Sequence, residues 1–188
     1  MHEPGLVVVV DGPRCVGTST TIAGMQRAWP DVRPGPLLEV GLDQTVNALG
    51  PGAHRWQELV TPSTRGHDGS PGWGPLGREL VVGMPRAAAA WAQAGLDVAL
   101  DHVLLDHPTV IDLENALAGL PVLHVGLVCD PDVLDDRERA VRDGGFGTAR
   151  AQLTATRDVA DRDLVLDTTE ATTDKLVHAI LAEVARRW

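Results

Sequence analysis

A glycine-rich segment near the N-terminus carries the clearest chemical signal of the chain. The apolar run of residues 6–10 is followed by Gly12 and Gly17, with four residues between the two glycines. Thr18 and Ser19 come directly after the second glycine. Between a strand and a helix, this spacing is typical of a loop whose backbone N–H groups bind phosphate with the aid of the helix dipole. The alternative is an ordinary strand–turn–helix with two turn glycines.

The residue after the second glycine departs from this pattern. Phosphate-binding loops that transfer phosphate place a lysine there, which reaches the β- and γ-phosphates. Here the position holds Thr18, and the single lysine of the chain, Lys175, lies in the C-terminal segment. Ser19 is placed where a hydroxyl could reach Mg²⁺. The sequence therefore predicts phosphate binding through the loop amides and leaves phosphoryl transfer open.

Length and composition predict one globular domain over residues 1–188. Hydrophobic residues make up 44% of the chain and charged residues 22%, which are ordinary globular values. The net charge of −10 argues against a nucleic-acid partner. No apolar run approaches the ~20 residues that span a bilayer, and no basic signal segment opens the chain, so we expect a cytoplasmic protein without a membrane partner. Composition says nothing about the oligomeric state.

The order of apolar and helical segments predicts an α/β fold. Helices are expected over 19–29, 75–94, 109–119, 147–158 and 170–188, with a kink or break at Pro85. Strands are expected over 6–10, 37–40, 97–101, 122–128 and 163–166. This alternation predicts a parallel sheet of about five strands with helices on both faces.

Two aspartates follow strands at the edge where parallel sheets bind ligands. Asp43 comes after the strand at 37–40, and either catalysis or N-capping of a helix over 44–49 would explain it. Asp101 ends the strand at 97–101. It either orients a metal ion or a water molecule, or it merely caps the strand end.

Two segments could close over such a site. Residues 50–74 are rich in Gly, Pro, Ser and Thr, which is typical of a substrate flap or of a floppy insertion. Residues 137–147 contain Arg137 and Arg142 before a glycine pair, which suits a lid over phosphates. The alternative for the second segment is a solvated charged helix face.

The order of these pieces resembles the chloramphenicol phosphotransferase family over nearly the whole chain. That family consists of small P-loop kinases of the nucleoside-monophosphate-kinase type, with a three-layer P-loop NTPase fold. The resemblance rests on the loop from Gly12 to Ser19 and on Gly41-Leu42-Asp43, Gly74-Pro75 with Arg78, Asp101-His102-Val103, Val125-Gly126, Cys129-Asp130, Arg137-Glu138 and Asp167-Thr168-Thr169.

The resemblance implies an ATP- and Mg²⁺-dependent kinase of a small hydroxylated metabolite or antibiotic. Asp43 would be the base for the acceptor hydroxyl, and Ser19 and Asp101 would hold Mg²⁺. The nucleotide would be bound by the loop residues Gly12, Pro13, Arg14, Cys15, Val16, Gly17, Thr18, Ser19 and Thr20. The substrate would meet Asp43, Arg78 and Asp101.

The resemblance also assigns the cations around the transferred phosphoryl group. Arg137 and Arg142 of the lid would neutralise it, and Arg14 could compensate for the lysine that Thr18 replaces. Three hypotheses follow. The protein is an active small-molecule kinase, a degenerate P-loop protein that binds a nucleotide or phosphorylated ligand without transfer, or an enzyme that uses Asp43 in other chemistry.

Overall fold

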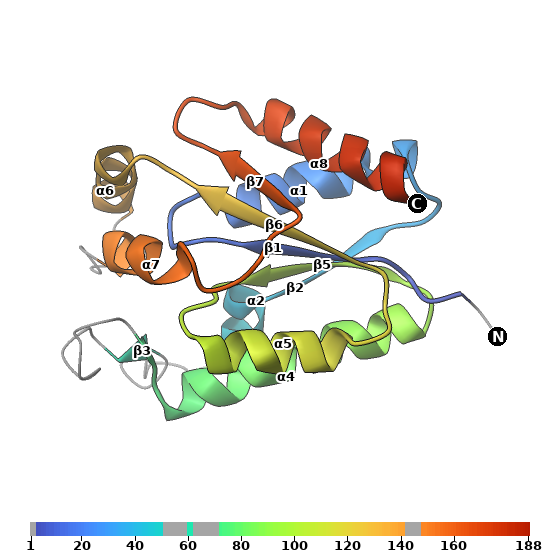
Figure 1. Cartoon of the computed structure of the whole chain (residues 1–188), viewed down its shortest axis with the longest axis horizontal. Coiled ribbons are helices and arrows are strands. Elements are labelled where there is room, and N and C mark those ends of the chain that lie inside the picture. The colour runs from blue at the N-terminus through green and yellow to red at the C-terminus, as the bar shows by residue number, and fades with distance from the viewer. Residues whose placement is uncertain (1–2, 51–59, 62–71, 142–147) are drawn as a thin grey trace.

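The computed structural model describes residues 3–50, 60–61, 72–141 and 148–188. Its main sheet has 5 strands in the order β2-β5-β1-β6-β7, all paired in parallel (Figure 1). The strands are β1 Val7–Asp11, β2 Leu37–Gly41, β5 Asp97–His102, β6 Val122–Val128 and β7 Leu164–Asp167. The parallel sheet predicted from the sequence is confirmed, and each strand lies within about one residue of its expected range.

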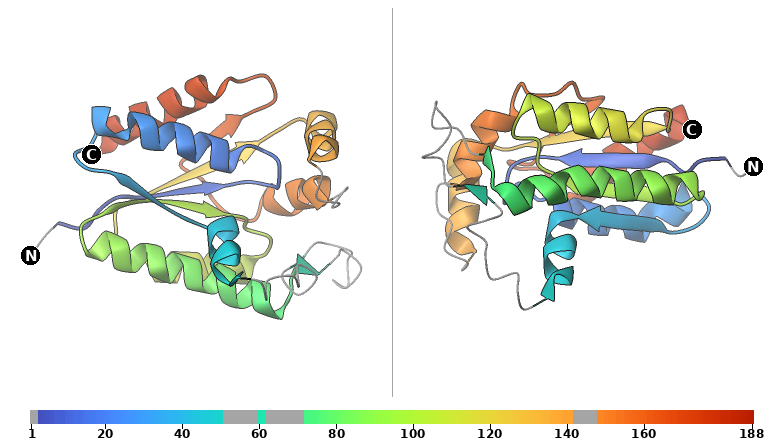
Figure 2. Two further views of the ribbon diagram at one scale, coloured as in Figure 1. Left: turned by 180° about the vertical axis from the view of Figure 1, so that it is seen from behind. Right: turned by 90° about the horizontal axis from the view of Figure 1, so that it is seen from below.

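Helices cover both faces of this sheet and the carboxyl ends of its strands (Figures 1 and 2). One face carries α1 Thr18–Ala28 and α8 Thr173–Arg187, with a short 3₁₀ turn at Trp29–Asp31 after α1. The other face carries α4 Pro75–Gln93 and α5 His107–Leu117. Beyond the carboxyl ends of the strands lie α2 Leu42–Ala48, α6 Pro131–Ala140 and α7 Thr148–Thr156.

The central strand explains why the sequence pattern predicted the fold well. Residues 7–10 are four consecutive valines with no exposed surface. Val8 and Val10 pack with α1 and α8, whereas Val7 and Val9 pack with α4 and α5. Since alternate residues of a strand point to opposite faces, a strand covered on both sides must be apolar throughout.

Of the kink or break expected at Pro85, the break does not occur, since α4 continues through this residue to Gln93. A proline has no N–H, so the carbonyl of Val81 loses its helical donor. Nε2 of the buried His102 lies 3.2 Å from that carbonyl oxygen. Burial lowers the pKa of His102, so the ring is neutral and donates through Nε2. The side chain of His102, on β5, thus supplies the hydrogen bond that Pro85 cannot donate to Val81.

The predicted flap and lid are only partly covered by the structure. In the flap, β3 Val60–Thr61 and β4 Gly72–Trp73 pair antiparallel. The other residues between 51 and 71, and residues 142–147 of the lid, lie outside the described residues. The single-domain prediction for 1–188, and the flap and lid roles, stay predictions.

Candidate active site

The segment between β1 and α1 has the backbone geometry of an anion-binding loop. Cys15 and Gly17 have left-handed φ angles of 64° and 106°. Gly17 is the N-cap residue of α1, and its carbonyl oxygen accepts from the N–H of Thr21 at 2.9 Å. Alternating backbone handedness turns successive N–H groups toward one point, and the start of a helix adds positive potential there.

Close packing fixes where this loop lies. A Cβ atom on Gly12 would come within 2.8 Å of Val16 Cγ1 and 2.9 Å of the Leu127 carbonyl oxygen, so the first position requires glycine. The N–H of Arg14 donates to Oε1 of Gln152 at 2.7 Å. Gln152 belongs to α7, so this helix is fastened directly to the loop.

The structure brings together the two residues predicted to hold a metal. Ser19 Oγ donates to Oδ2 of Asp101 at 3.1 Å, and Thr18 Oγ1 donates to the same oxygen at 3.2 Å. The sheet register explains this proximity, because Asp101 pairs with Val10 one residue before the end of β1. The hydroxyl at the lysine position is therefore directed to a carboxylate.

The pKa of Asp101, at the same edge of the sheet, departs from its ordinary value. Burial is the largest of the effects that raise its pKa to about 6, and the carboxylates of Asp43 and Glu39 act in the same direction. The hydroxyl groups of Ser19 and Thr18 act in the opposite direction. The site thus concentrates negative charge next to the phosphate loop, which favours a bound cation.

Asp43 lies at the same edge, as the resemblance implied. It is exposed in the first turn of α2, whose N-cap residue is Gly41. The alternative role of Asp43 as an N-cap is therefore wrong. Gly41 pairs with Asp101 in the sheet, which explains why the charge of Asp43 acts on Asp101.

The residues at this edge fit Mg²⁺ only together with a ligand. Mg²⁺ keeps several waters and usually takes one or two protein carboxylates plus substrate phosphates. Within the described part of the chain, no group of three His, Cys, Asp or Glu side chains could hold a metal ion unaided. The hydroxyl of Ser19 and the carboxylate of Asp101 would supply only part of the ligands of Mg²⁺, and a bound phosphate and water would supply the rest.

Arg78 joins two helices in the structure. Its guanidinium donates to Asp106 at 3.3 Å, to Thr109 at 2.8 Å and to Asp112 at 2.9 Å. Asp106 is the N-cap residue of α5, so Arg78 connects the start of α4 to the start of α5. The substrate-binding role of Arg78 stays a prediction.

The arginines expected around the phosphoryl group have different surroundings. Arg137 donates two hydrogen bonds to Thr168: Nη2 donates to the carbonyl oxygen at 2.6 Å, and Nη1 donates to Oγ1 at 3.0 Å. Nη1 also lies 3.5 Å from the carbonyl oxygen of Val16. It therefore connects α6 to the loop and to the end of β7. Arg14 lies in the loop itself, whereas Arg142 lies outside the described residues. Their charge-neutralising roles stay predictions.

Sequence reasoning missed a buried ion pair under the loop. Arg162 Nε lies 2.8 Å from Oδ2 of Asp11, which is fully buried at the end of β1. Nη2 of Arg162 contacts the same oxygen at 2.5 Å. The available signal was an aspartate directly after four valines, since a charged group in a fully buried strand requires a partner.

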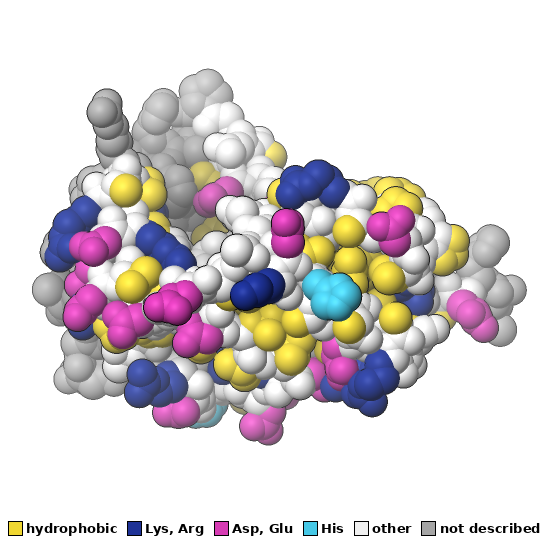
Figure 3. Space-filling model, turned by 90° about the horizontal axis from the view of Figure 1, so that it is seen from above, with side chains coloured by type: hydrophobic (Ala, Val, Ile, Leu, Met, Phe, Trp, Pro, Cys, Tyr) yellow, Lys and Arg dark blue, Asp and Glu magenta, His cyan; other side chains and the backbone are white. Residues whose placement is uncertain are grey.

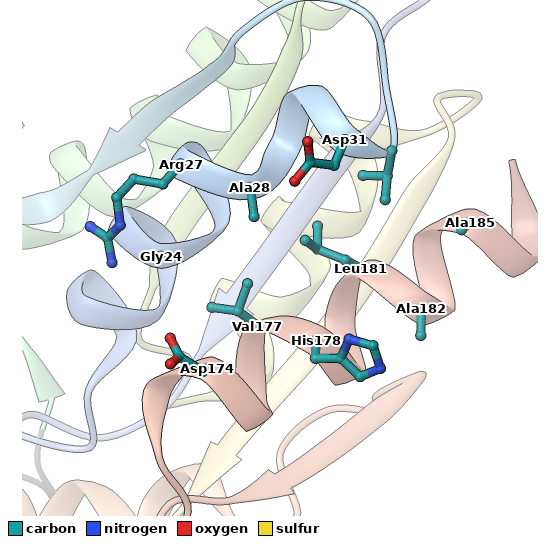
Figure 4. Close-up of a pocket in the computed structure, with 11 residues that line it drawn as sticks. Gly24, Arg27, Ala28, Asp31, Asp174, Val177, His178, Leu181, Ala182 and Ala185 are labelled. Carbon is teal, nitrogen blue, oxygen red and sulfur yellow. The ribbon is translucent and has the colours of Figure 1, made fainter.

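A hollow of about 410 Å³ lies at the carboxyl ends of β6 and β7 and is lined in part by Cys129, Thr156, Arg162 and Thr169. A second hollow, of about 530 Å³, lies between α1 and α8 on a face where apolar side chains gather (Figures 3 and 4). The second includes neither the loop nor Asp101, so it is not part of the candidate active site.

No helix within the described ranges has the length and apolar character that crossing a bilayer requires.

The sheet order, with a phosphate-type loop after the central strand, defines an α/β protein of the P-loop kinase type. The model of the chloramphenicol phosphotransferase-like protein family matches residues 5–185. The chain therefore belongs to this family, as its motifs indicated. Membership supports a small-molecule phosphotransferase in general terms. The comparison with curated proteins gave no match.

Solved structures share this fold at low identity. An unliganded sugar kinase from Janibacter sp. HTCC2649 is 20% identical, with a TM-score of 0.64 over 96% of this chain and 95% of that one. The tunicamycin resistance protein of Deinococcus radiodurans is 21% identical, with a TM-score of 0.63 over 96% and 95%. The APS kinase of Mycobacterium tuberculosis, in complex with AMPPNP and APS, is 16% identical, with a TM-score of 0.69 over 96% and 98%. At these identities the likeness shows the P-loop kinase fold.

Proposed function

We propose that the protein transfers a phosphoryl group from ATP to a hydroxyl group of a small metabolite or antibiotic, with Mg²⁺. One observation carries the proposal: Ser19 of the phosphate loop is 3.1 Å from Asp101, whose pKa is raised in part by Asp43. A phosphate-binding loop, a hydroxyl–carboxylate pair and a further exposed carboxylate thus share one edge of the sheet. Family membership supports the same reaction class.

Each residue has a distinct role in this proposal. Backbone amides of the loop, at the start of α1, hold the phosphates of the nucleotide, and Ser19 and Asp101 hold Mg²⁺, which offsets phosphate charge. Asp43 accepts the proton of the acceptor hydroxyl, a contribution of typically ~10²–10⁴ in rate.

A second candidate is nucleotide binding without phosphoryl transfer. The presence of Thr18 at the lysine position favours this candidate, because threonine has no ammonium group. The hydroxyl of Thr18 already donates a hydrogen bond to Asp101. Amides and helix dipole suffice for ground-state binding of phosphate. A lysine acts mostly as charge moves toward the leaving oxygen, so its absence is felt in the transition state.

A calorimetric titration with ATP and Mg²⁺, followed by an ATP-consumption assay over a panel of hydroxylated metabolites and antibiotics, separates the candidates. Binding with acceptor-dependent consumption supports the kinase. Binding without consumption across the panel supports the second candidate. If neither ATP nor its magnesium complex binds, the loop is not a nucleotide site and both candidates fail.

A further inference from the structure

The guanidinium of Arg162 uses all its donor nitrogens on the protein itself. Nε and Nη2 donate to Asp11, and Nη2 also donates to the carbonyl oxygen of Thr156 at 2.6 Å. Nη1 donates to the carbonyl oxygens of Arg157 at 3.2 Å and Ala160 at 3.3 Å. Arg162 therefore joins the C-terminal end of α7 to the last residue of β1, directly before the phosphate loop.

Asp11 lies at the centre of a cluster of buried polar side chains. Its Oδ1 accepts from the N–H of Leu104 at 3.1 Å. His102 of β5 lies next to it in the register of β1, and Nε2 of His124 of β6 lies 3.8 Å from Oδ2. Burial raises the pKa of Asp11, but His124 and Arg162 outweigh burial and hold that pKa below its ordinary value. Asp11 is therefore a carboxylate adjacent to the loop.

We propose that Arg162 is a positioning residue that keeps the phosphate loop in its anion-binding form by pairing with Asp11. The inference rests on the proposed function in that it takes the loop as the phosphate site. Arg162 neutralises a charge that would repel an anion bound to the next residues. It also holds the end of α7, whose Gln152 accepts from the N–H of Arg14.

Gly126 leaves the space that the side chain of Arg162 occupies. A Cβ atom at this position of β6 would come within 2.1 Å of Cδ and 2.6 Å of Nε of Arg162. The side chain of Arg162 therefore lies directly on the strand, where any residue other than glycine would displace it. This gives a way to move Arg162 without changing its charge.

The first test compares Arg162→Ala with Arg33→Ala. Arg33 pairs with the buried Asp97 at 2.8 and 3.1 Å, so it is the same kind of ion pair at the opposite end of the sheet. At an effective dielectric constant of about 20, a unit charge about 10 Å from a singly charged anion changes its binding roughly tenfold, and a multiply charged anion is affected more. Calorimetry with sulfate and with ATP should therefore give a Kd raised at least roughly tenfold in Arg162→Ala and unchanged in Arg33→Ala.

Two further variants separate positioning from general loss of stability. Arg162→Lys keeps the charge and should recover part of the affinity. Gly126→Ala should weaken binding in the wild type but not further in an Arg162→Ala background, because the methyl group then meets no arginine. An Arg162→Ala protein that binds sulfate and ATP like the wild type overturns the proposal.

Hydrogen exchange of the free protein tests the positioning without any ligand. The amides of residue 12 and residues 14–17 should exchange at least about tenfold faster in Arg162→Ala than in Arg33→Ala. Equal exchange in the two variants refutes the inference. If the wild type binds neither sulfate nor ATP, the proposed function fails on that ground alone, and the exchange result still decides the role of Arg162.

Discussion

The side-chain hydroxyl of Thr18 lies 3.2 Å from Oδ2 of Asp101. Thr18 occupies the position from which a lysine reaches the β- and γ-phosphates in phosphate-transferring loops. Ser19 donates to the same carboxylate oxygen, so two adjacent loop hydroxyls converge on one acid. Substitution of Thr18 by lysine therefore changes both the charge near the phosphates and the surroundings of Asp101.

Thr18→Lys is expected to raise kcat by at least about tenfold while ATP affinity changes by less than about threefold. The physical reason is that an ammonium group beside the leaving oxygen stabilises charge that develops in the transition state. Steady-state kinetics and calorimetry measure the two quantities. Thr18→Met, which adds length without charge, serves as the control and should give no gain.

The gain should disappear in an Asp43→Ala background, since an activated phosphoryl group still needs an activated acceptor. An active wild type that Thr18→Lys does not improve would mean that another cation has taken over. Arg14→Ala should then abolish most of the activity.

Asp43→Asn is expected to lower kcat by about 10²–10⁴ with little change in ATP affinity. The amide keeps the size of the side chain but cannot accept the acceptor proton. Asn47→Ala, an exposed change on the same helix α2, is the matched control and should leave kcat unaltered. A kcat for Asp43→Asn within a factor of three of the wild type would remove Asp43 as the base.

Gly17→Ala should weaken phosphate binding and destabilise the fold by about 1–2 kcal/mol. The φ of 106° at Gly17 suits glycine and strains any residue with a Cβ atom. Gly83→Ala is the control, because Gly83 lies inside α4 with open space around its Cβ position. That change should stabilise the protein by about 0.5–1 kcal/mol. Urea unfolding and sulfate titration measure both effects.

Asp101→Asn should stabilise the protein at neutral pH. The pKa of Asp101 is about 6 in the folded protein against an ordinary 3.8, so the folded state binds this proton more tightly. The resulting stability is fully present below about pH 4 and is lost as the pH rises through about 6. Allowing for partial exposure, the variant should be about 1–2 kcal/mol more stable than the wild type at pH 7.5. Urea midpoints that differ equally at pH 4.5 and 7.5 would contradict the assignment.

His102→Leu should destabilise the protein by about 1–3 kcal/mol, because the buried carbonyl of Val81 then loses its donor. Adding Pro85→Ala restores an N–H at the position that helical geometry requires. The double variant should therefore recover part of the lost stability in urea unfolding, whereas Pro85→Ala alone should have a small effect. Strictly additive losses would show that the two sites are independent.

Some parts of the site could be read from the chain because their signals are local. Asp130 before Pro131 is one such local signal, because proline suits the first position of a helix, and the structure has Asp130 as the N-cap residue of α6. The spacing of Gly12 and Gly17 located the loop, since a turn of this kind requires glycine at fixed positions. The partners of Arg78 and Arg137 could not be read, because each depends on segments that meet only in the folded protein.

The sequence by itself determined the parallel α/β sheet, the loop after β1 and the order of Ser19, Asp43 and Asp101 along the strand ends. Runs of apolar residues, glycines and capping residues act on their near neighbours, so their effect is visible without the fold. The tertiary structure decided that Thr18 donates to Asp101 and that Asp11 pairs with Arg162, 151 residues further along the chain. Buried charges must find a partner. Which of the arginines supplies it depends on the loops that the sheet brings together.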